Sequence, residues 1–442
     1  ASRSAIVTLN DQKPIDQWSA DAQELKDRGV GILAGCEAPR WLLDQIEMVI
    51  VSPGVARNKI PVRYAERAGA EVIGEFELAS RHLRGRIVAI TGTNGKTTTT
   101  ALTGKILNDA GLPTLVGGNI GVPFISLVDE SRDDGWTVVE ASSFQLETIR
   151  SFHPQVAIAL NVTLDHMDRY ATLNEYAQAK HRIFMNQQAG DVAILNADDE
   201  IVAGWTGGLK AHVVLFSIKH ELPEGLFLRG GHEIVSRSRG DEKILVTRLV
   251  NREEMQLRGL HNVQNVMAAM AAGLACGVSP DSIYESVKNF APVEHRLERV
   301  AEINGVCFYN DSKATNVDAT IKALEAFVED AGQVVLLMGG RGKGASYSSL
   351  VPLLKLKARA VIVYGEDARR ITNDLKDATT IIHASDLNEA TRLAFGAATA
   401  GDVVLLAPAC ASFDMFENYE DRGRVFKEAV LSLSAKRMIC VD

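Results

Sequence analysis

The chain has 442 residues, which is enough for two to four domains of ordinary size. Hydrophobic residues make up 46% of it and charged residues 23%, the proportions of a globular protein with a large core. The formal net charge of −9 argues against nonspecific binding to nucleic acid or to an anionic membrane surface.

Cysteine usage and hydropathy indicate the compartment. The five cysteines are odd in number, widely scattered and without a Cys-X-X-Cys pair, which predicts free thiols in a reducing cytosol rather than disulfides or a zinc site. No apolar run approaches the roughly 18 residues of a membrane span. The first residues show no signal-peptide pattern. We therefore expect a cytoplasmic protein without a membrane partner.

The first 75 residues alternate short apolar runs with helical patterns. The runs at 6–9, 32–33 and 48–51 predict buried parallel strands. The turn Ser52-Pro53-Gly54 closes the last of them. We expect residues 1–75 to form an N-terminal Rossmann-like domain.

A second block, expected to be a central domain over 76–292, opens with an apolar strand at 86–91 that runs into a Gly-rich turn and a helix. Short alternating segments over 212–250, broken by Gly and charge, predict an antiparallel patch. An Ala-rich helix follows at about 262–276. Further buried strands are predicted at 137–140, 156–161 and 192–196.

The third block, over 293–442, alternates strands with helical stretches, which predicts a second doubly wound unit. Its strands are predicted at 306–309, 334–338, 360–364 and 403–406. The whole chain is therefore expected to be an α/β protein of three domains, with a central P-loop ATPase domain and a C-terminal Rossmann-like domain.

The segment Thr91–Thr97 reads Thr-Gly-Thr-Asn-Gly-Lys-Thr and lies between a strand and a helix. Glycines let backbone N–H groups approach phosphate oxygens, and a helix N-terminus adds a favourable dipole. Lys96 would reach the β- and γ-phosphates, and the Thr97 hydroxyl would bind Mg²⁺. The usual spacing asks for Gly at position 90, where Ile stands, so this is a variant of the motif. The alternative is a tight turn with a surface lysine.

Acidic and imidazole groups follow two other predicted strands. Glu140 ends one, and the segment 161–168, with Asp165, His166 and Asp168, follows another. Carboxyl ends of strands in open α/β sheets are where ligands bind, and carboxylates near phosphates suit Mg²⁺. Taken alone, Glu140 could be a capping residue and His166 a satisfied polar group. Lys180, in a helical pattern, is by itself an ordinary solvated lysine.

Three polar or Gly-rich turns follow predicted strands of the third block, at 310–316, 339–344 and 408–414. Their convergence predicts the rim of a cleft. Cys410 has no histidine partner placed by the sequence, so we expect a buried thiol rather than a nucleophile.

These motifs, in this order and over nearly the whole chain, resemble the Mur ligases, and among them the branch that adds D-glutamate. The family uses ATP to form amide bonds in peptidoglycan precursors. The resemblance rests on Thr91–Thr97, Glu140–Glu147, Asn161–Tyr170, Asn310–Asn316 and Pro408–Asp414.

The resemblance implies a set of roles. ATP would be bound by Gly92, Thr93, Asn94, Gly95, Lys96, Thr97, Thr98, Asn262, Asn265, Arg296, Asp311 and Lys313. Two Mg²⁺ ions would be held by Thr97, Glu140, His166 and a carbamylated Lys180, with Lys96, Glu140, His166 and Lys180 as the catalytic set. The UDP-sugar substrate would contact Asp11, Ser52, Pro53, Gly54, Asn119 and His166. D-Glutamate would contact Thr315, Lys343, Ser412, Phe413 and Tyr419, the last standing where the family has Phe.

The family begins with a strand, a Gly-rich turn and a helix that bind the UDP end. This chain is expected to begin at the second strand, which ends at Asn10-Asp11. The implied reaction joins D-glutamate to UDP-N-acetylmuramoyl-L-alanine through an acyl phosphate, in a monomer. The alternatives are a ligase similar to folylpolyglutamate synthases and an inactive nucleotide-binding module.

Overall fold

The computed structural model describes residues 5–18, 21–55, 59–167, 169–239, 244–328 and 330–435. Asp168 of the predicted acidic segment lies outside these residues, and so does Cys440. The contacts divide the chain into two compact units, Ala1–His82 with Phe144–Phe152, and Leu83–Ser143 with His153–Asp442. The predicted domain boundaries stay a prediction. No helix among the described residues is long and apolar enough to cross a membrane.

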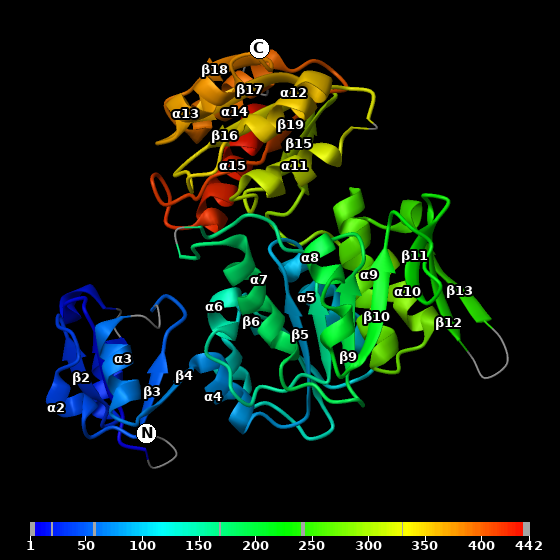
Figure 1. Ribbon diagram of the computed structural model, residues 1–442. Coiled ribbons are helices and arrows are strands. Elements are labelled where there is room, and N and C mark those ends of the chain that lie inside the picture. The colour runs from blue at the N-terminus through cyan, green and yellow to red at the C-terminus, as the bar shows by residue number, and fades with distance from the viewer. Residues whose placement is uncertain are drawn as a thin grey trace. The chain divides into compact units, whose positions relative to one another are not determined.

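The first unit contains two separate two-stranded parallel sheets, β1–β2 and β3–β4 (Figure 1). β1 pairs in parallel with β2, as predicted, but it is exposed along its length, so the expected burial of the strand at 6–9 is wrong. The reason is that the apolar clusters of this unit, around Leu43 and Val72, draw on residues 38–72. The elements are β1 (Thr8–Asp11), α1 (Asp21–Asp27), β2 (Gly31–Ala34), α2 (Arg40–Leu43), β3 (Met48–Val51), α3 (Ile60–Arg67), β4 (Glu71–Gly74) and α4 (Glu75–His82).

A buried carboxylate fastens α4 within this unit. Glu77 accepts hydrogen bonds from the backbone N–H groups of Arg150, Ser151 and Phe152, at 2.8–3.1 Å. The Ser151 hydroxyl and the Arg81 guanidinium donate to the same carboxylate. Burial alone raises the pKa of Glu77, but these donors outweigh it and lower the pKa to about 2.

A nine-stranded sheet forms the centre of the second unit, in the order β13-β12-β11-β10-β9-β8-β5-β7-β6. The elements of this part are β5 (Arg86–Thr91), α5 (Lys96–Asp109), β6 (Thr114–Gly118), β7 (Trp136–Glu140), β8 (Val156–Ala159), α7 (Leu173–His181), β9 (Val192–Asn196), α8 (Glu200–Ala203), β10 (His212–Ser217), β11 (Gly225–Arg229), β12 (Glu233–Arg239), β13 (Ile244–Asn251), α9 (Leu260–Ala275) and α10 (Pro280–Lys288). The short helix α6 (Ser143–Leu146) begins at the last residue of the stretch Leu83–Ser143 and continues into Phe144–Phe152 of the first unit.

The predicted antiparallel patch over 212–250 is only partly right. β10 pairs parallel with both β9 and β11, and antiparallel pairing begins at β11 and β12. β11 and β12 are joined through Gly230 and Gly231, whose φ values are 59° and 77°. A turn this tight joins only antiparallel strands, whereas β9 and β10 are joined through a crossover that includes α8.

The core of this sheet explains its sequence pattern. Val88 and Ile90 of β5 are fully buried in one cluster with Ile106 of α5 and Met267 of α9. The small residues of α9 let the two helices approach closely, because a Cβ at Gly273 would lie 2.8 Å from the Ile106 side chain. The packing holds α5, and with it the turn before it, at the carboxyl end of β5.

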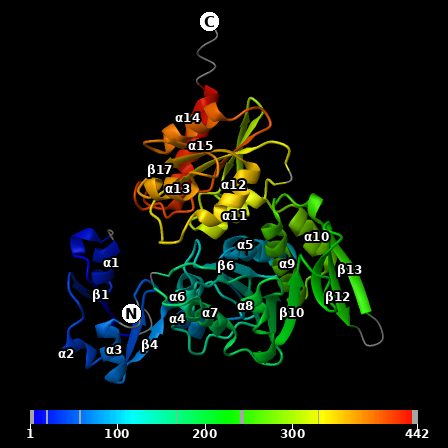
Figure 2. The same cartoon turned by 45° about the horizontal axis from the view of Figure 1, so that its top comes forward.

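The C-terminal part carries a six-stranded sheet in the order β14-β15-β19-β16-β17-β18, parallel except for β14. Figure 2 shows its helices α11 to α15 around the sheet. The elements are β14 (Glu298–Ile303), β15 (Val306–Asn310), α11 (Val317–Glu325), β16 (Val334–Gly339), α12 (Val351–Lys357), β17 (Ala358–Tyr364), α13 (Ala368–Leu375), β18 (Thr380–His383), α14 (Leu387–Ala397), β19 (Val403–Leu406) and α15 (Tyr419–Ala435).

Both faces of this sheet are buried, and β16 shows why its sequence is a continuous apolar run. Leu336 packs in the cluster that includes α11, α12 and α13, and its neighbour Leu337 packs in the cluster that includes α14 and α15. The sequence missed β14 and β18, the two edge strands. An edge strand needs less apolar cover, and these two carry Glu, Arg, Thr and His residues.

Candidate active site

The turn between β5 and α5 has the geometry of a phosphate-binding loop. Gly92 and Gly95 have φ values of 157° and 87°. A Cβ at Gly95 would lie 2.1 Å from Oδ1 of Asn265, so the loop packs closely against α9. The first turn of α5 begins at Lys96, which directs the helix dipole and its N-terminal N–H groups toward this loop.

Two lysines, Lys180 buried and Lys96 half-buried, converge on one carbonyl of this loop. Lys96 Nζ donates to the carbonyl oxygens of Gly92 at 3.0 Å and Thr93 at 2.9 Å, and Lys180 Nζ donates to Gly92 at 2.7 Å. Burial lowers the pKa of both lysines, and the nearby Lys96 ammonium lowers the pKa of Lys180 further. Lys180 is only 2% exposed, so its interpretation as a solvated helical lysine is wrong.

A carboxylate and a hydroxyl meet beside the loop. Glu140, buried at the end of β7, accepts a hydrogen bond from the Thr97 hydroxyl at 2.8 Å and one from the Asn119 amide at 2.9 Å. Arg296 Nη2 donates to the same Thr97 oxygen at 2.5 Å. Carboxylate and hydroxyl oxygens are the ligands that Mg²⁺ prefers, so Thr97 and Glu140 fit a magnesium ion.

The other two predicted metal ligands contact different groups. His166 has a left-handed backbone, with φ 56°, and its ring lies edge-on to Tyr176, with centroids 6.2 Å apart. Its Nε2 is 3.7 Å from the Asp165 carboxylate. Lys180 Nζ lies 4.4 Å from the centre of the same Tyr176 ring. His166 and Lys180 therefore both lie against the Tyr176 ring.

Only one group of three His, Cys, Asp or Glu side chains in the described ranges is close enough to share a cation, namely Glu294, His295 and Glu298. Lys427 donates to both glutamates, at 2.9 and 2.6 Å. Its ammonium already supplies the positive charge there, so this cluster is an ion-pair network rather than a metal centre.

A cavity of about 1180 Å³ in the second unit gathers most of the predicted ATP residues. Asn262 and Asn265 are buried in α9 and joined by a hydrogen bond of 3.1 Å. From the C-terminal part, burial raises the pKa of Asp311 to about 7 and lowers the pKa of Lys313 to about 8. The lining includes Thr93, Asn94, Gly95, Lys96, Thr98, Asn262, Asn265, Arg296, Asp311 and Lys313.

The predicted amino-acid residues divide into two groups. Thr315 and Lys343 line the large cavity, whereas Ser412, Phe413 and Tyr419 are outside its lining. Ser412 is buried and Phe413 is 66% exposed. Lys313 Nζ lies 3.7 Å from the centre of the Tyr419 ring, so Tyr419 adjoins the cavity through that lysine.

The three strand-end turns do converge, as the sequence predicts. Backbone hydrogen bonds join Arg341 to Ala411, and the amide of Gly339 donates to the carbonyl of Pro408. The sequence missed the residue that binds all three turns. Arg422 of α15 is fully buried and donates to Ser312, Gly339 and Cys410 carbonyls. The feature of the sequence that indicates this role is an arginine on the buried face of an amphipathic helix.

The thiol of Cys410 is fully buried, and burial raises its pKa to about 12. The prediction of a buried thiol is therefore confirmed.

The predicted UDP-sugar residues belong to different units. In the first unit, Asp11 is exposed and accepts a hydrogen bond from the Lys13 backbone at 2.9 Å. Ser52 and Pro53 line a small hollow with Phe144 and Gln145, and Gly54 is the next residue along that turn. In the second unit, Asn119 and His166 line the large cavity. This set of contacts stays a prediction.

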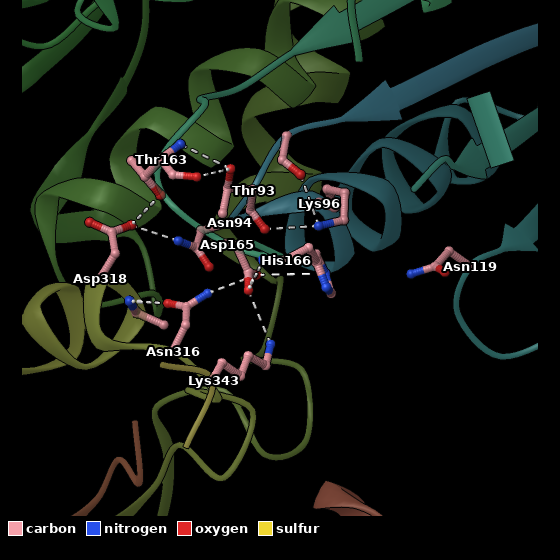
Figure 3. Close-up of polar contacts among 12 residues, drawn as sticks. Thr93, Asn94, Lys96, Asn119, Thr163, Asp165, His166, Asn316, Asp318 and Lys343 are labelled. Carbon is pink, nitrogen blue, oxygen red and sulfur yellow. Dashed lines mark hydrogen bonds and ion pairs between the residues drawn. The ribbon is translucent and has the colours of Figure 1, made fainter. Parts of the chain in front are cut away.

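A polar cluster joins the central loops to the C-terminal part (Figure 3). Asp165 accepts from Lys343 Nζ at 3.1 Å and from the Asn316 amide at 3.2 Å. Burial raises the pKa of Asp165, but the charges of Lys343 and His166 and the hydrogen bonds from Lys343 and Asn316 together outweigh burial and hold that pKa below its ordinary value. The sequence placed Asp165 in a metal-binding segment and did not identify it as a partner of Lys343.

The site combines a phosphate loop, two converging lysines, an oxygen pair suited to Mg²⁺ and a cavity lined from two α/β sheets. This combination defines a nucleotide-dependent enzyme. Profiles of two protein families match the chain, the Mur ligase middle domain over residues 90–273 and the Mur ligase glutamate ligase domain over residues 295–410.

Full-length relatives and solved structures agree. The chain is 46% identical to the UDP-N-acetylmuramoylalanine–D-glutamate ligase of Koribacter versatilis over 433 residues, which cover 98% of this chain and 93% of that protein. It is 46% identical to the ligase of the same name from Acidobacterium capsulatum, with 97% and 92% covered. A crystal structure of MurF from Acinetobacter baumannii has the same fold, with a TM-score of 0.64, 18% identity, and 97% and 92% covered. The chain belongs to the Mur ligase family, and it is an ATP-dependent ligase.

Proposed function

We propose that this ligase joins D-glutamate to UDP-N-acetylmuramoyl-L-alanine in peptidoglycan precursor synthesis. The observation that carries the proposal is the 46% identity, over 98% of the chain, to a ligase named for that reaction. The chemistry of the site agrees with this reaction. The cavity is lined by the phosphate loop and by Lys343, whose ammonium group already pairs with the carboxylate of Asp165. A cytoplasmic monomer stays a prediction.

The reaction has two steps. A terminal carboxylate oxygen of the UDP-sugar substrate attacks the γ-phosphorus of ATP, the bond to the bridging oxygen breaks, and ADP leaves. The D-glutamate amine then attacks the carbonyl carbon of the acyl phosphate, loses a proton, and phosphate leaves with the formation of the amide. Lys96, the first residue of α5, would bind the charge on the γ-phosphate during the first step.

We propose that Mg²⁺ binds at two places. Thr97 and Glu140 would hold one ion, and His166 with Lys180 would hold a second. When bound, the ions would offset negative charge on the phosphates. Lys180 needs modification for this role, because an ammonium repels a cation.

The burial of Lys180 supplies the condition for that modification. A neutral amine reacts with carbon dioxide to give a carbamate and a proton, and burial lowers the Lys180 pKa well below its ordinary value. The product is an anionic oxygen ligand next to the phosphate loop. We therefore propose that Lys180 is carbamylated in the active enzyme.

D-Glutamate would bind between the turns of the C-terminal sheet. Lys343 would pair with one of its carboxylates, as it pairs with Asp165 at 3.1 Å. Thr315 lines the same cavity. We also propose that Ser412, Phe413 and Tyr419 contact D-glutamate.

Phosphate release, measured with each substrate omitted in turn, tests the proposal. We expect release only when ATP, Mg²⁺, UDP-N-acetylmuramoyl-L-alanine and D-glutamate are all present, and a product heavier by one glutamyl residue. L-Glutamate with a folate acceptor is the comparison for a folylpolyglutamate synthase activity. ATP binding without phosphate release under full substrate conditions would instead identify an inactive nucleotide-binding module.

A further inference from the structure

The N-terminus of α11 docks on two loops of the central part (Figure 3). Asn316 is the N-cap of α11, and its side-chain oxygen accepts from the Ala319 amide at 2.8 Å. Its side-chain nitrogen donates to Asp165 at 3.2 Å. The same helix turn carries Asp318, which has no role in the ligand set described above.

The Asp318 carboxylate spans two loops at once. Its Oδ2 accepts from the Asn94 side-chain amide of the phosphate loop at 2.6 Å. The same oxygen accepts from the Thr163 hydroxyl, in the loop after β8, at 3.2 Å. All three residues are partly buried, so these hydrogen bonds are shielded from water on one side.

The two loops form a rigid base for this contact. The backbone amide of Asn94 donates to Asn161 Oδ1 at 2.8 Å, and the side-chain nitrogen of Asn161 donates back to the backbone carbonyl of Asn94 at 3.1 Å. The Thr163 amide donates to Thr93 Oγ1 at 3.0 Å. The position of Asp318 is therefore tied to the backbone of the phosphate loop itself.

Two other contacts between the central loops and the C-terminal part use groups that have ligand roles in the proposed function. Lys343 pairs with Asp165, and Arg296 donates to Thr97. A substrate carboxylate competes for Lys343, and a magnesium ion competes for Thr97. The phosphate loop binds nucleotide through its backbone N–H groups, so the Asn94 side chain can keep its bond to Asp318 throughout.

We propose that Asp318 is a positioning residue that fixes the amino-acid turn, Thr315 and Asn316, against the phosphate loop. Asp318 lines the large cavity, and it would act through α11 to couple the nucleotide site to the amino-acid site. The inference rests on the proposed function, because Thr315 and D-glutamate enter through it.

A carboxylate in the first turn of a helix also favours that helix through the dipole, so this simpler role needs a control. Asp281 occupies the first turn of α10 and is exposed. Asp281→Ala removes a first-turn carboxylate without a cross-loop contact. Asp318→Asn removes the charge but keeps an oxygen that accepts from Asn94 and Thr163.

Steady-state kinetics of the full chain test the coupling. We expect Asp318→Ala to raise the KM for D-glutamate about tenfold, the effect of one or two lost hydrogen bonds, and to change the KM for ATP less than about twofold. Asp318→Asn should restore most of the loss, and Asp281→Ala should leave both constants unchanged. The double variant Asn94→Ala/Asp318→Ala should lose less than the product of the two single losses.

Amide hydrogen exchange of the protein alone separates this inference from the proposed function. Asp318→Ala should speed exchange at the Ala319 and Thr320 amides about tenfold, and Asp281→Ala should not. Unchanged exchange overturns the inference whether or not the enzyme ligates D-glutamate. Faster exchange with an unchanged D-glutamate KM in an active enzyme also overturns it. Failure of the wild-type chain to release phosphate with D-glutamate counts against the proposed function only.

Discussion

Glu77 offers the most quantitative test of the structure. Its carboxylate, fully buried, accepts from three consecutive backbone amides, from the Ser151 hydroxyl and from Arg81. Glu77→Gln keeps the shape of the side chain but removes its charge. It also points an NH₂ group at N–H donors, which leaves donors unsatisfied.

The pKa of Glu77 gives the magnitude. It falls from the ordinary value of 4.5 to about 2. A difference of about 2.5 units, at about 1.36 kcal/mol each, corresponds to a stabilisation on the order of 3 kcal/mol. Because the folded pKa lies below the unfolded one, this contribution is complete above pH 4.5 and is lost as the pH falls from 4.5 toward 2.

Native-state hydrogen exchange at Arg150, Ser151 and Phe152 measures the effect. At pH 7 we expect Glu77→Gln to lower the free energy of opening of these amides by about 3 kcal/mol. The difference from wild type should shrink below pH 4. Glu71→Gln is the matched control, because Glu71 also pairs with Arg81 but is partly exposed and accepts none of these amides. A change below about 1 kcal/mol at pH 7, or one equal to that of the control, would refute the reasoning.

The remaining predictions concern the active site. Lys96→Ala should lower phosphate release at least about 100-fold with an unchanged circular dichroism spectrum, and near-normal turnover would remove Lys96 from the nucleotide site. Lys343→Ala and Ser412→Ala should raise the KM for D-glutamate about tenfold and the KM for ATP less than about twofold; equal effects on both would exclude them from the amino-acid site. Lys180→Ala should lose activity that a short-chain carboxylic acid partly restores, and a crystal structure with an unmodified Lys180 at high bicarbonate and Mg²⁺ would falsify the carbamate.

The sequence determined features that depend on neighbouring residues. The strands at 48–51, 86–91, 192–196 and 403–406 fall where their apolar runs predict them. The phosphate turn before α5 was also predicted, because a strand, two glycines and a helix start specify it locally. The polar turns were also predicted at the ends of strands, because open α/β sheets bind ligands at the carboxyl ends of their strands.

Only the tertiary structure decided which distant residues meet. Lys180 is buried because α7 packs its side chain onto the Gly92 carbonyl, 88 residues earlier in the chain, and nothing in its helix pattern shows this. Asp318 reaches Asn94 across 224 residues of sequence. Short-range patterns specify helices, strands and turns, because those depend on neighbouring side chains. Contacts between loops depend on how complete domains pack, and that packing is set by the summed burial of both cores rather than by any local pattern.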